Sequence, residues 1–192
     1  MSMPNVIALA LLVGFMILQR IMRRGEQARS LQPSPVDCGS TRLLGVAFGL
    51  GLLALVAAPL LNAYGVASTE PAKTVAWIGI AVMVAGLALR IWSQAVLGRY
   101  YTSTLCHAAD QPVLTSGPYC LLRHPGYAGL LLAWLGAGLA SANWAVACTV
   151  TLLMVVVYSH RIAAEEAMLL AAFGDRYKEY MARTWRVIPF IC

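Results

Sequence analysis

Long apolar stretches separated by shorter polar segments are the dominant pattern along this chain. Five such stretches are found, at about residues 4–22, 43–61, 75–97, 126–140 and 144–160. A helix of about 20 apolar residues is long enough to cross the ~30 Å hydrocarbon core of a bilayer. The pattern therefore predicts an all-α integral membrane protein, with five transmembrane helices in a single membrane-embedded domain over residues 1–192.

The last two apolar stretches are separated only by Ser141, Ala142 and Asn143, which predicts a tight helical hairpin. The fourth stretch is shorter than the ~20 residues that a span needs, but it can extend into its flanks. In an antiparallel pair, the two ends away from the turn lie at the same level. We therefore expect His124, before the fourth span, to lie near Arg161, after the fifth.

Composition and charge support a membrane protein and give it an orientation. The chain is 60% hydrophobic and 11% charged, whereas soluble domains carry about 25% charged residues. The net charge is +6. The charged residues flank the apolar stretches and do not line up as a basic stripe on a soluble face, so we expect no nucleic-acid partner. The segment 19–42 is rich in arginine, whereas the only charged residues in the segment 62–74 are Glu70 and Lys73. Lys and Arg favour the cytoplasmic side, which predicts an external N-terminus and a cytoplasmic C-terminal catalytic region, with a tail at 161–192.

Cysteine and glycine patterns add little chemistry. The five cysteines are odd in number and form no CxxC pair, so neither a disulfide framework nor a metal site is expected. The string from Gly49 to Ala54 matches GxGxxA, but it lies inside an apolar stretch with no preceding strand, so we assign it no nucleotide-binding role. Gly45 and Gly49 form a GxxxG pair, which favours close helix packing there.

Two polar segments on the predicted cytoplasmic side hold the candidate chemistry. The first contains SGPYCLLRHPGYAG, residues 116–129, and the second follows the fifth span. Arg161 and Glu165 are four residues apart and share one helix face, whereas Glu166 points about 100° away. Phe173 and Gly174 predict a helix end. Taken one at a time, such residues are more often interface anchors or a solvated helix face, and only their combination indicates a site.

The combination resembles a known family. Its motifs are Leu97 to Tyr101 (LGRYY), Thr115 to Tyr119 (TSGPY), Arg123 to Gly129 (RHPGYAG), Glu165-Glu166, and Phe173 to Tyr180 (FGDRYKEY). In this order they resemble the isoprenylcysteine carboxyl methyltransferase family, which has phospholipid N-methyltransferases as relatives. The resemblance implies S-adenosylmethionine as methyl donor. It also implies a lipophilic acceptor, with the carboxylate of an isoprenylated cysteine favoured.

The resemblance also suggests roles for individual residues. Arg161 and Glu165 are the expected catalytic residues on the acceptor side. The expected cofactor-binding residues are Tyr119, His124, Pro125, Tyr127, Gly129 and Glu166, with Glu166 holding the donor's ammonium and Gly129 permitting close approach. A carboxylate acceptor needs no base, whereas an amine acceptor would need Glu165 or His124 as base. The sequence leaves both options open.

Some of these features also occur in proteins with different functions. Membrane sterol-type reductases that use NAD(P)H carry a similar RHPxY string, although they typically have Asn where this chain has Gly126 and an acid where it has Leu130. The sequence is also compatible with a phospholipid N-methyltransferase or with a non-enzymatic membrane scaffold. The glutamate pair downstream of the string favours the methyltransferase.

The expected location follows from the apolar spans. We expect a multi-pass protein of a bacterial-type inner membrane, or of the endoplasmic reticulum in a eukaryote. Its partners would be the lipid bilayer and a lipophilic or prenylated acceptor.

Overall fold

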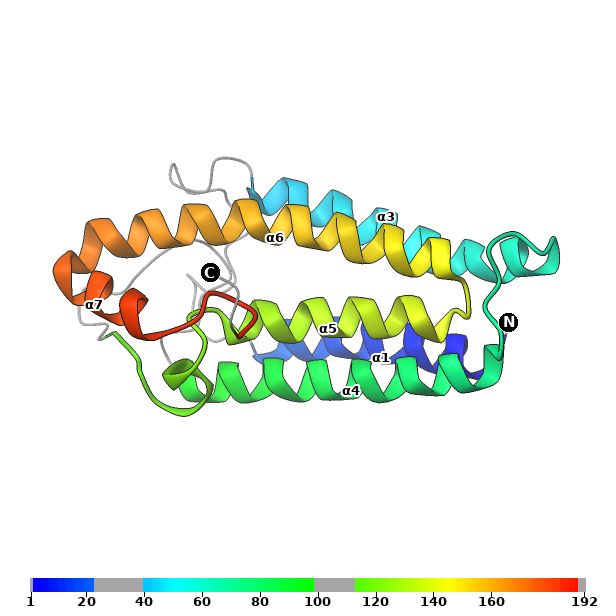
Figure 1. Ribbon diagram of the computed structural model, residues 1–192, viewed down its shortest axis with the longest axis horizontal. Helices are drawn as coiled ribbons and strands as arrows, with labels where there is room; N and C mark the ends of the chain where they lie inside the picture. The colour runs from blue at the N-terminus through cyan, green and yellow to red at the C-terminus, as the bar shows by residue number, and fades with distance from the viewer. Residues whose placement is uncertain (1, 23–39, 99–112, 190–192) are drawn as a thin grey trace.

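The computed structural model describes residues 2–22, 40–98 and 113–189, and these form an elongated bundle of helices (Figure 1). The described residues contain no β-strand, only two isolated bridges. In chain order the elements are α1 (Met3–Met22), α3 (Ser40–Ala63), α4 (Ala72–Leu97), the 3₁₀ turn η2 (Gly117–Cys120), α5 (Pro125–Ala140), α6 (Trp144–Phe173) and α7 (Asp175–Arg183).

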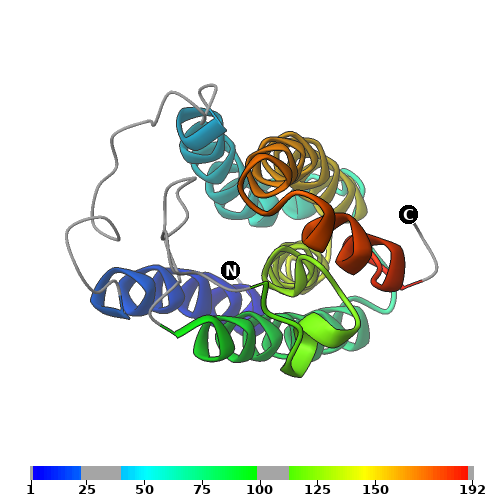
Figure 2. The same ribbon diagram turned by 90° about the vertical axis from the view of Figure 1, so that its left-hand side faces the viewer.

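The five long helices correspond to the five predicted apolar stretches and alternate in direction along the bundle axis. Seen from the end, α3 and α6 lie beside each other above α1, α4 and α5 (Figure 2). Helix α5 packs against both α4 and α6, so it occupies the centre. The short α7 lies at the end of the bundle where α5 begins (Figure 1).

Length and composition qualify three of these helices to cross a membrane: Thr41–Ala63, Ala72–Leu97 and Trp144–Phe173. The apolar helices Met3–Gln19 and Pro125–Ala140 are shorter. The all-helical architecture is therefore confirmed for the described residues, whereas the count of five spans stays a prediction. The predicted helix end is confirmed, because α6 stops at Phe173 and Gly174 follows with a φ of 55°.

Glycines bring α4 and α5 unusually close together. A Cβ added to Gly86 would lie 2.5 Å from the carbonyl oxygen of Gly129, and one added to Gly136 would overlap the amide nitrogen of Met83. Such backbone contact requires small residues at the interface. The packing predicted for Gly45 and Gly49 is wrong for the described residues, because none of them comes within 4 Å of a Cβ at either position. Their GxxxG spacing lies on an exposed face of α3.

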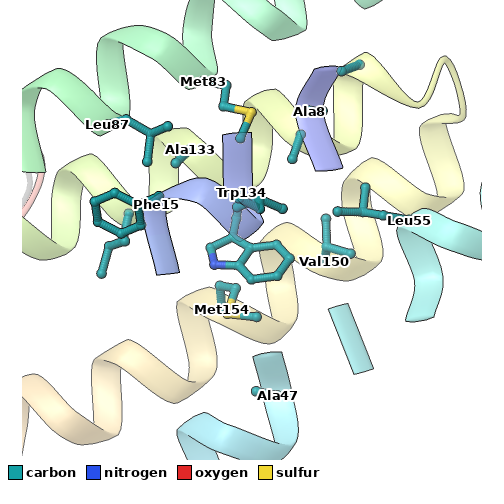
Figure 3. Close-up of a cluster of buried hydrophobic side chains, with 14 of the residues drawn as sticks. Ala8, Phe15, Ala47, Leu55, Met83, Leu87, Ala133, Trp134, Val150 and Met154 are labelled. Atoms are coloured by element: carbon teal, nitrogen blue, oxygen red, sulfur yellow. The ribbon is translucent and has the colours of Figure 1, made fainter. Parts of the chain in front are cut away.

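The bundle core is centred on Trp134 of α5, which is 1% exposed (Figure 3). Its ring meets Phe48 of α3 edge-on, with ring centroids 5.0 Å apart. Met83 of α4 and Met154 of α6 are fully buried in the same cluster. Because one indole contacts side chains from several helices, burial of its apolar area fixes the position of α5 between its neighbours.

The end of the bundle remote from α7 is closed by the predicted hairpin turn. The side-chain oxygen of Asn143 accepts the amide of Val146 at 3.0 Å and so caps α6. Its amide nitrogen donates to the carbonyl of Val66 and to Oδ1 of Asn62, each at 2.8 Å. This network ties the connector between α3 and α4 to the α5–α6 turn. It confirms the tight hairpin, and it leaves the candidate chemistry at the opposite end.

Candidate functional site at the α7 end of the bundle

The segment after α7 returns along the start of α5 and pairs with it through the backbone. The amide of Arg123 donates to the carbonyl of Trp185 at 2.7 Å, and the amide of Trp185 donates to the carbonyl of Leu121 at 2.9 Å. The amide of His124 then donates to the carbonyl of Arg186 at 3.0 Å. We call residues 184–186 the C-terminal strap. These bonds place the strap directly beside the Arg-His-Pro sequence.

Helix α7 adds a second attachment through its tyrosines. The hydroxyl of Tyr180 donates to the carbonyl of Tyr119 in η2 at 2.7 Å. Burial raises the pKa of Tyr180 to about 12, so the phenol keeps its proton and remains a donor at any physiological pH. Burial, with a further contribution from the charge of Glu166, also raises the pKa of Tyr177. The two rings contact each other with centroids 5.9 Å apart. Helix α7 thus packs two neutral phenols against the site.

Three basic groups surround the carboxylate of Glu166 on α6. Its Oε1 accepts from Nε of Arg123 at 3.1 Å and lies 3.2 Å from Nε2 of His124. Its Oε2 lies 2.8 Å from Nη2 of Arg186, in the strap. The Arg123 and Glu166 side chains are each only 10% exposed. One buried carboxylate therefore joins α6, the start of α5 and the strap, and its negative charge is compensated by the two guanidinium groups.

Arg123 also stabilises the end of α7. Its Nη1 donates to the carbonyl of Met181 at 2.8 Å and to the carbonyl of Thr184. Since the last carbonyls of a helix lack partners within the helix, a guanidinium here satisfies groups that would otherwise be unbonded. The same side chain thus links the strap, the end of α7 and Glu166.

Tyr127, in the first turn of α5, is the centre of a second network. Its hydroxyl donates to Oε2 of Glu165 at 2.8 Å and accepts from Nε of Arg161 at 3.1 Å. Its ring lies 5.8 Å from that of His124 and 5.4 Å from that of Tyr158, measured between centroids. Arg161 extends the network to α3, because its Nη1 donates to Oγ1 of Thr41 at 3.1 Å. Arg161 itself is 5% exposed.

The two glutamates therefore have different partners, as expected for adjacent residues on a continuous helix. Glu165 lies with Arg161 on the Tyr127 side, and the phenol lies between the two as a shared hydrogen-bonding partner. Glu166 faces the basic groups of the strap and of α5. These contacts suggest an additional role for Glu166, as the anchor of the strap. Its assignment to the donor's ammonium stays a prediction.

The remaining predicted site residues lie at the same end of the bundle. Pro125 is the buried first residue of α5, and Tyr119 belongs to η2. Gly129 faces α4, where an added Cβ would lie 2.5 Å from the carbonyl oxygen of Gly86. Close helix packing accounts for this glycine, so its proposed approach to the cofactor stays a prediction. Arg99 to Tyr101, which belong to the first quoted motif, lie outside the described residues.

Sequence reasoning did not assign roles to several residues that complete the site. Arg123 stands inside the Arg-His-Pro triplet, so its position in the motif was a usable signal. Arg186 and Thr41 gave none, because each reaches the site through contacts distant in sequence. Arg90 of α4 lies against the start of α5, since a Cβ on Gly126 would overlap its Nη1.

Comparison with known proteins finds similar sequences and a similar fold. Residues 77–171 match the profile of the Isoprenylcysteine carboxyl methyltransferase (ICMT) family. This part of the chain, which contains the Arg-His-Pro sequence and the glutamate pair, is similar to the ICMT family. A probable protein-S-isoprenylcysteine O-methyltransferase of Oryza sativa subsp. indica is 33% identical over 119 residues, which cover 61% of this chain and 62% of the relative. The protein-S-isoprenylcysteine O-methyltransferase of Schizosaccharomyces pombe is 34% identical over 82 residues, covering 43% of this chain and 35% of the relative.

The fold also matches a solved ICMT structure. The eukaryotic intramembrane Ras methyltransferase ICMT superposes with a TM-score of 0.68 over 99% of this chain and 69% of that chain, at 22% identity. This likeness concerns the fold. The match to the rice relative spans 62% of that protein's length. The resemblance read from the motifs is thus confirmed, and the membrane-type helical fold with it.

The ICMT-matched segment contains only part of the site. Arg123, His124, Tyr127, Arg161 and the glutamate pair lie within residues 77–171. Thr41 and Arg186, which bond to Arg161 and Glu166, lie on either side of that segment. The helices and strap outside the ICMT match therefore supply contacts to the residues inside it.

Proposed function

We propose that this protein transfers a methyl group from S-adenosylmethionine to the carboxylate of a lipophilic acceptor, with an isoprenylated cysteine as the favoured class. One observation carries the proposal: the glutamate pair of α6 is hydrogen bonded to the first turn of α5 inside the ICMT-matched segment. The names of the curated relatives support carboxyl methylation of prenylated cysteine. The apolar bundle supports an acceptor that resides in the bilayer.

The chemistry of the site fits such a donor. S-adenosylmethionine combines an ammonium, a carboxylate and a sulfonium, and when bound it supplies an electrophilic methyl group. Carboxylates suit an ammonium, guanidinium groups suit a carboxylate, and aromatic faces suit a sulfonium. The site offers all three within two turns of α5 and α6. We assign donor binding to Tyr119, His124, Pro125, Tyr127, Gly129 and Glu166.

The acceptor side is assigned to Arg161 and Glu165. A carboxylate acceptor is already ionised at pH 7, so the chain has no proton to remove from it. The guanidinium of Arg161 would pair with the acceptor carboxylate and orient it. Tyr127 holds Arg161 on one side and Glu165 on the other. Positioning in a site with little water accounts for rate enhancement without a base.

We further propose that the α7 end faces the cytoplasm, with all five long helices crossing the membrane. The start of α3, which carries Arg42, and helix α7, which carries Arg176 and Arg183, lie at that end, whereas the connector with Glu70 and the start of α4 with Lys73 lie at the other. This distribution follows the positive-inside rule. An acceptor anchored in the inner leaflet would then reach Arg161 and Tyr127 from the bilayer.

Donor binding in detergent tests the proposal first. We expect calorimetry to detect S-adenosylmethionine binding and no NADPH binding, which separates a methyltransferase from a sterol-type reductase. His124→Ala should weaken donor binding roughly tenfold, since a lost polar contact in a buried site costs ~1–3 kcal/mol. His160→Ala, at an exposed position on α6, is the matched control and should leave the affinity unchanged. Binding of NADPH alone would contradict the proposal.

A panel of acceptors then tests the reaction class. Purified protein with methyl-labelled S-adenosylmethionine is offered a prenylated N-acetylcysteine, a lipid amine and a lipophilic thiol. We expect label in the prenylated carboxylate. Label in the amine alone would assign the chain to N-methylation, where Glu165 or His124 would serve as base.

A further inference from the structure

Thr41 connects helix α3 to the site. Its Oγ1 accepts a hydrogen bond from Nη1 of Arg161 at 3.1 Å, across 120 positions of sequence. Thr41 is the second residue of α3, and Arg161 is buried on the neighbouring α6. Thr41 lies outside the segment that matches the family profile, which begins at residue 77.

Hydrogen bonds to two different helices help to orient the Arg161 guanidinium. Its Nε donates to the hydroxyl of Tyr127 on α5, and its Nη1 donates to Thr41 on α3. Because the guanidinium is planar and rigid, acceptors on two of its nitrogens constrain the plane of the group. Thr41 therefore contributes to the direction in which the Arg161 guanidinium faces.

Electrostatics makes the Thr41 hydroxyl more important. The first turn of a helix carries a partial positive charge from its unpaired N–H groups, and this charge repels the Arg161 cation beside the start of α3. A side-chain oxygen in that turn gives the cation an acceptor at the point where the helix itself offers only donors. Valine has the same shape as threonine but lacks this acceptor, so it isolates the hydrogen bond from the packing.

We propose that Thr41 is a positioning residue for methyl transfer, acting through Arg161 to set the orientation of the acceptor carboxylate. The inference rests on the proposed function, because it takes Arg161 as the group that pairs with that carboxylate. It adds a residue from the N-terminal helices to a site whose other acceptor-side residues all lie in the C-terminal half.

The test compares Thr41→Val with Thr41→Ser. Initial rates are measured with methyl-labelled S-adenosylmethionine and an S-farnesylated N-acetylcysteine in detergent, and donor affinity is measured by calorimetry. We expect Thr41→Val to lower kcat/KM for the acceptor about tenfold, the effect of losing one hydrogen bond to a charged group. Thr41→Ser should stay within about twofold of wild type, and donor affinity should be unchanged in both variants. Thr74→Val is the control, because Thr74 lies in the first turn of α4 at the far end of the bundle.

A double-mutant cycle provides a readout without turnover. Thr41→Val should lower the thermal unfolding midpoint when Arg161 is present and have little effect in an Arg161→Met background. Equal rates for Thr41→Val and wild type, or equal losses for Thr41→Val and Thr41→Ser, would overturn the inference while leaving the proposed function intact. Equal stability effects in both backgrounds would overturn it as well. A wild-type protein that methylates no acceptor would instead overturn the proposed function and, with it, this inference.

Discussion

Glu165 and Glu166 are neighbours in sequence with different electrostatic surroundings. Glu166 binds three basic groups at about 10% exposure, whereas Glu165 receives a hydrogen bond from Tyr127. Removing the charge of Glu166 leaves Arg123 and Arg186 without their partner, and breaking a buried ion pair from one side costs about 3 kcal/mol. We therefore expect Glu166→Gln to lower the unfolding midpoint and weaken donor binding. Glu165→Gln should leave the unfolding midpoint and donor binding unchanged and should lower turnover.

Thermal unfolding, donor calorimetry and turnover, measured on both glutamate variants, separate these roles. Arg161→Lys should behave like Glu165→Gln, because Lys cannot reproduce the planar two-pronged donor. If Glu165→Gln loses donor binding while Glu166→Gln keeps it, the roles of the two glutamates are reversed. Two variants indistinguishable from wild type would show that neither carboxylate contributes to donor binding or turnover.

The hydroxyl of Tyr127 is the shared partner of the two acceptor-side residues. Tyr127→Phe keeps the ring contacts with His124 and Tyr158 but deletes the hydrogen bonds to Glu165 and Arg161. Because the ring is the part of Tyr127 that we assign to the donor, we expect donor affinity to be retained, whereas turnover should fall at least tenfold, as measured by calorimetry and single-turnover rates. Tyr64→Phe, at an exposed position remote from the site, is the control. Wild-type turnover in Tyr127→Phe would remove this hydroxyl from the acceptor side.

At the scale of elements, the position of α5 depends on its contact with α4. Gly129 and Gly136 touch the backbone of α4, whereas no described residue approaches a Cβ at Gly45 or Gly49. We expect Gly136→Ala to destabilise the protein by about 1–3 kcal/mol through overpacking. Gly45→Ala and Gly49→Ala should be tolerated. Unfolding midpoints in detergent check this, and a stable Gly136→Ala variant would show that the two helices are less tightly packed than described.

Gly129 provides a second comparison within the same helix. If it serves packing alone, Gly129→Ala should lower stability and donor affinity no more than Gly136→Ala does. A selective loss of donor binding in Gly129→Ala would support the close approach of a cofactor. Comparing the two variants thus shows whether Gly129 serves helix packing or cofactor approach, which its position in the sequence does not reveal.

Apolar length and turn residues predicted the helices, because both are local properties. The stretches at 126–140 and 144–160 and the turn at Ser141 to Asn143 were sufficient to predict the hairpin of α5 and α6. The strap was not predictable in the same way, since residues 184–186 pair with 121–124 through backbone hydrogen bonds. Such bonds leave no side-chain periodicity in the sequence.

The candidate site shows the same division between local and long-range signals. His124, Tyr127 and the glutamate pair stand in compact motifs, and the α5–α6 hairpin brings these motifs together. Arg186 and Thr41 join from opposite parts of the chain through tertiary packing, so no local pattern marked them. The GxxxG prediction for Gly45 and Gly49 failed because the same spacing also occurs on an exposed helix face.

At the scale of the whole molecule, the proposed orientation in the membrane rests on the distribution of arginines. In a cysteine-free background, we expect Glu70→Cys to react with an impermeant thiol reagent from the external side. Arg176→Cys on α7 should react only after the membrane is opened. Both positions are exposed, so accessibility within the fold does not limit the reaction. Labelling of Glu70→Cys from the cytoplasmic side alone would contradict the proposed topology.

The central proposal is that this helical bundle catalyses carboxyl methylation at its α7 end. Its most direct test is the formation of a base-labile methyl ester by the purified protein. Methyl-labelled S-adenosylmethionine and an S-farnesylated N-acetylcysteine are incubated with it, and labelled methanol is collected after alkaline hydrolysis. The account predicts labelled methanol from wild type and at least tenfold less from Tyr127→Phe. Absence of labelled methanol from a wild-type protein that is folded and binds the donor would contradict it.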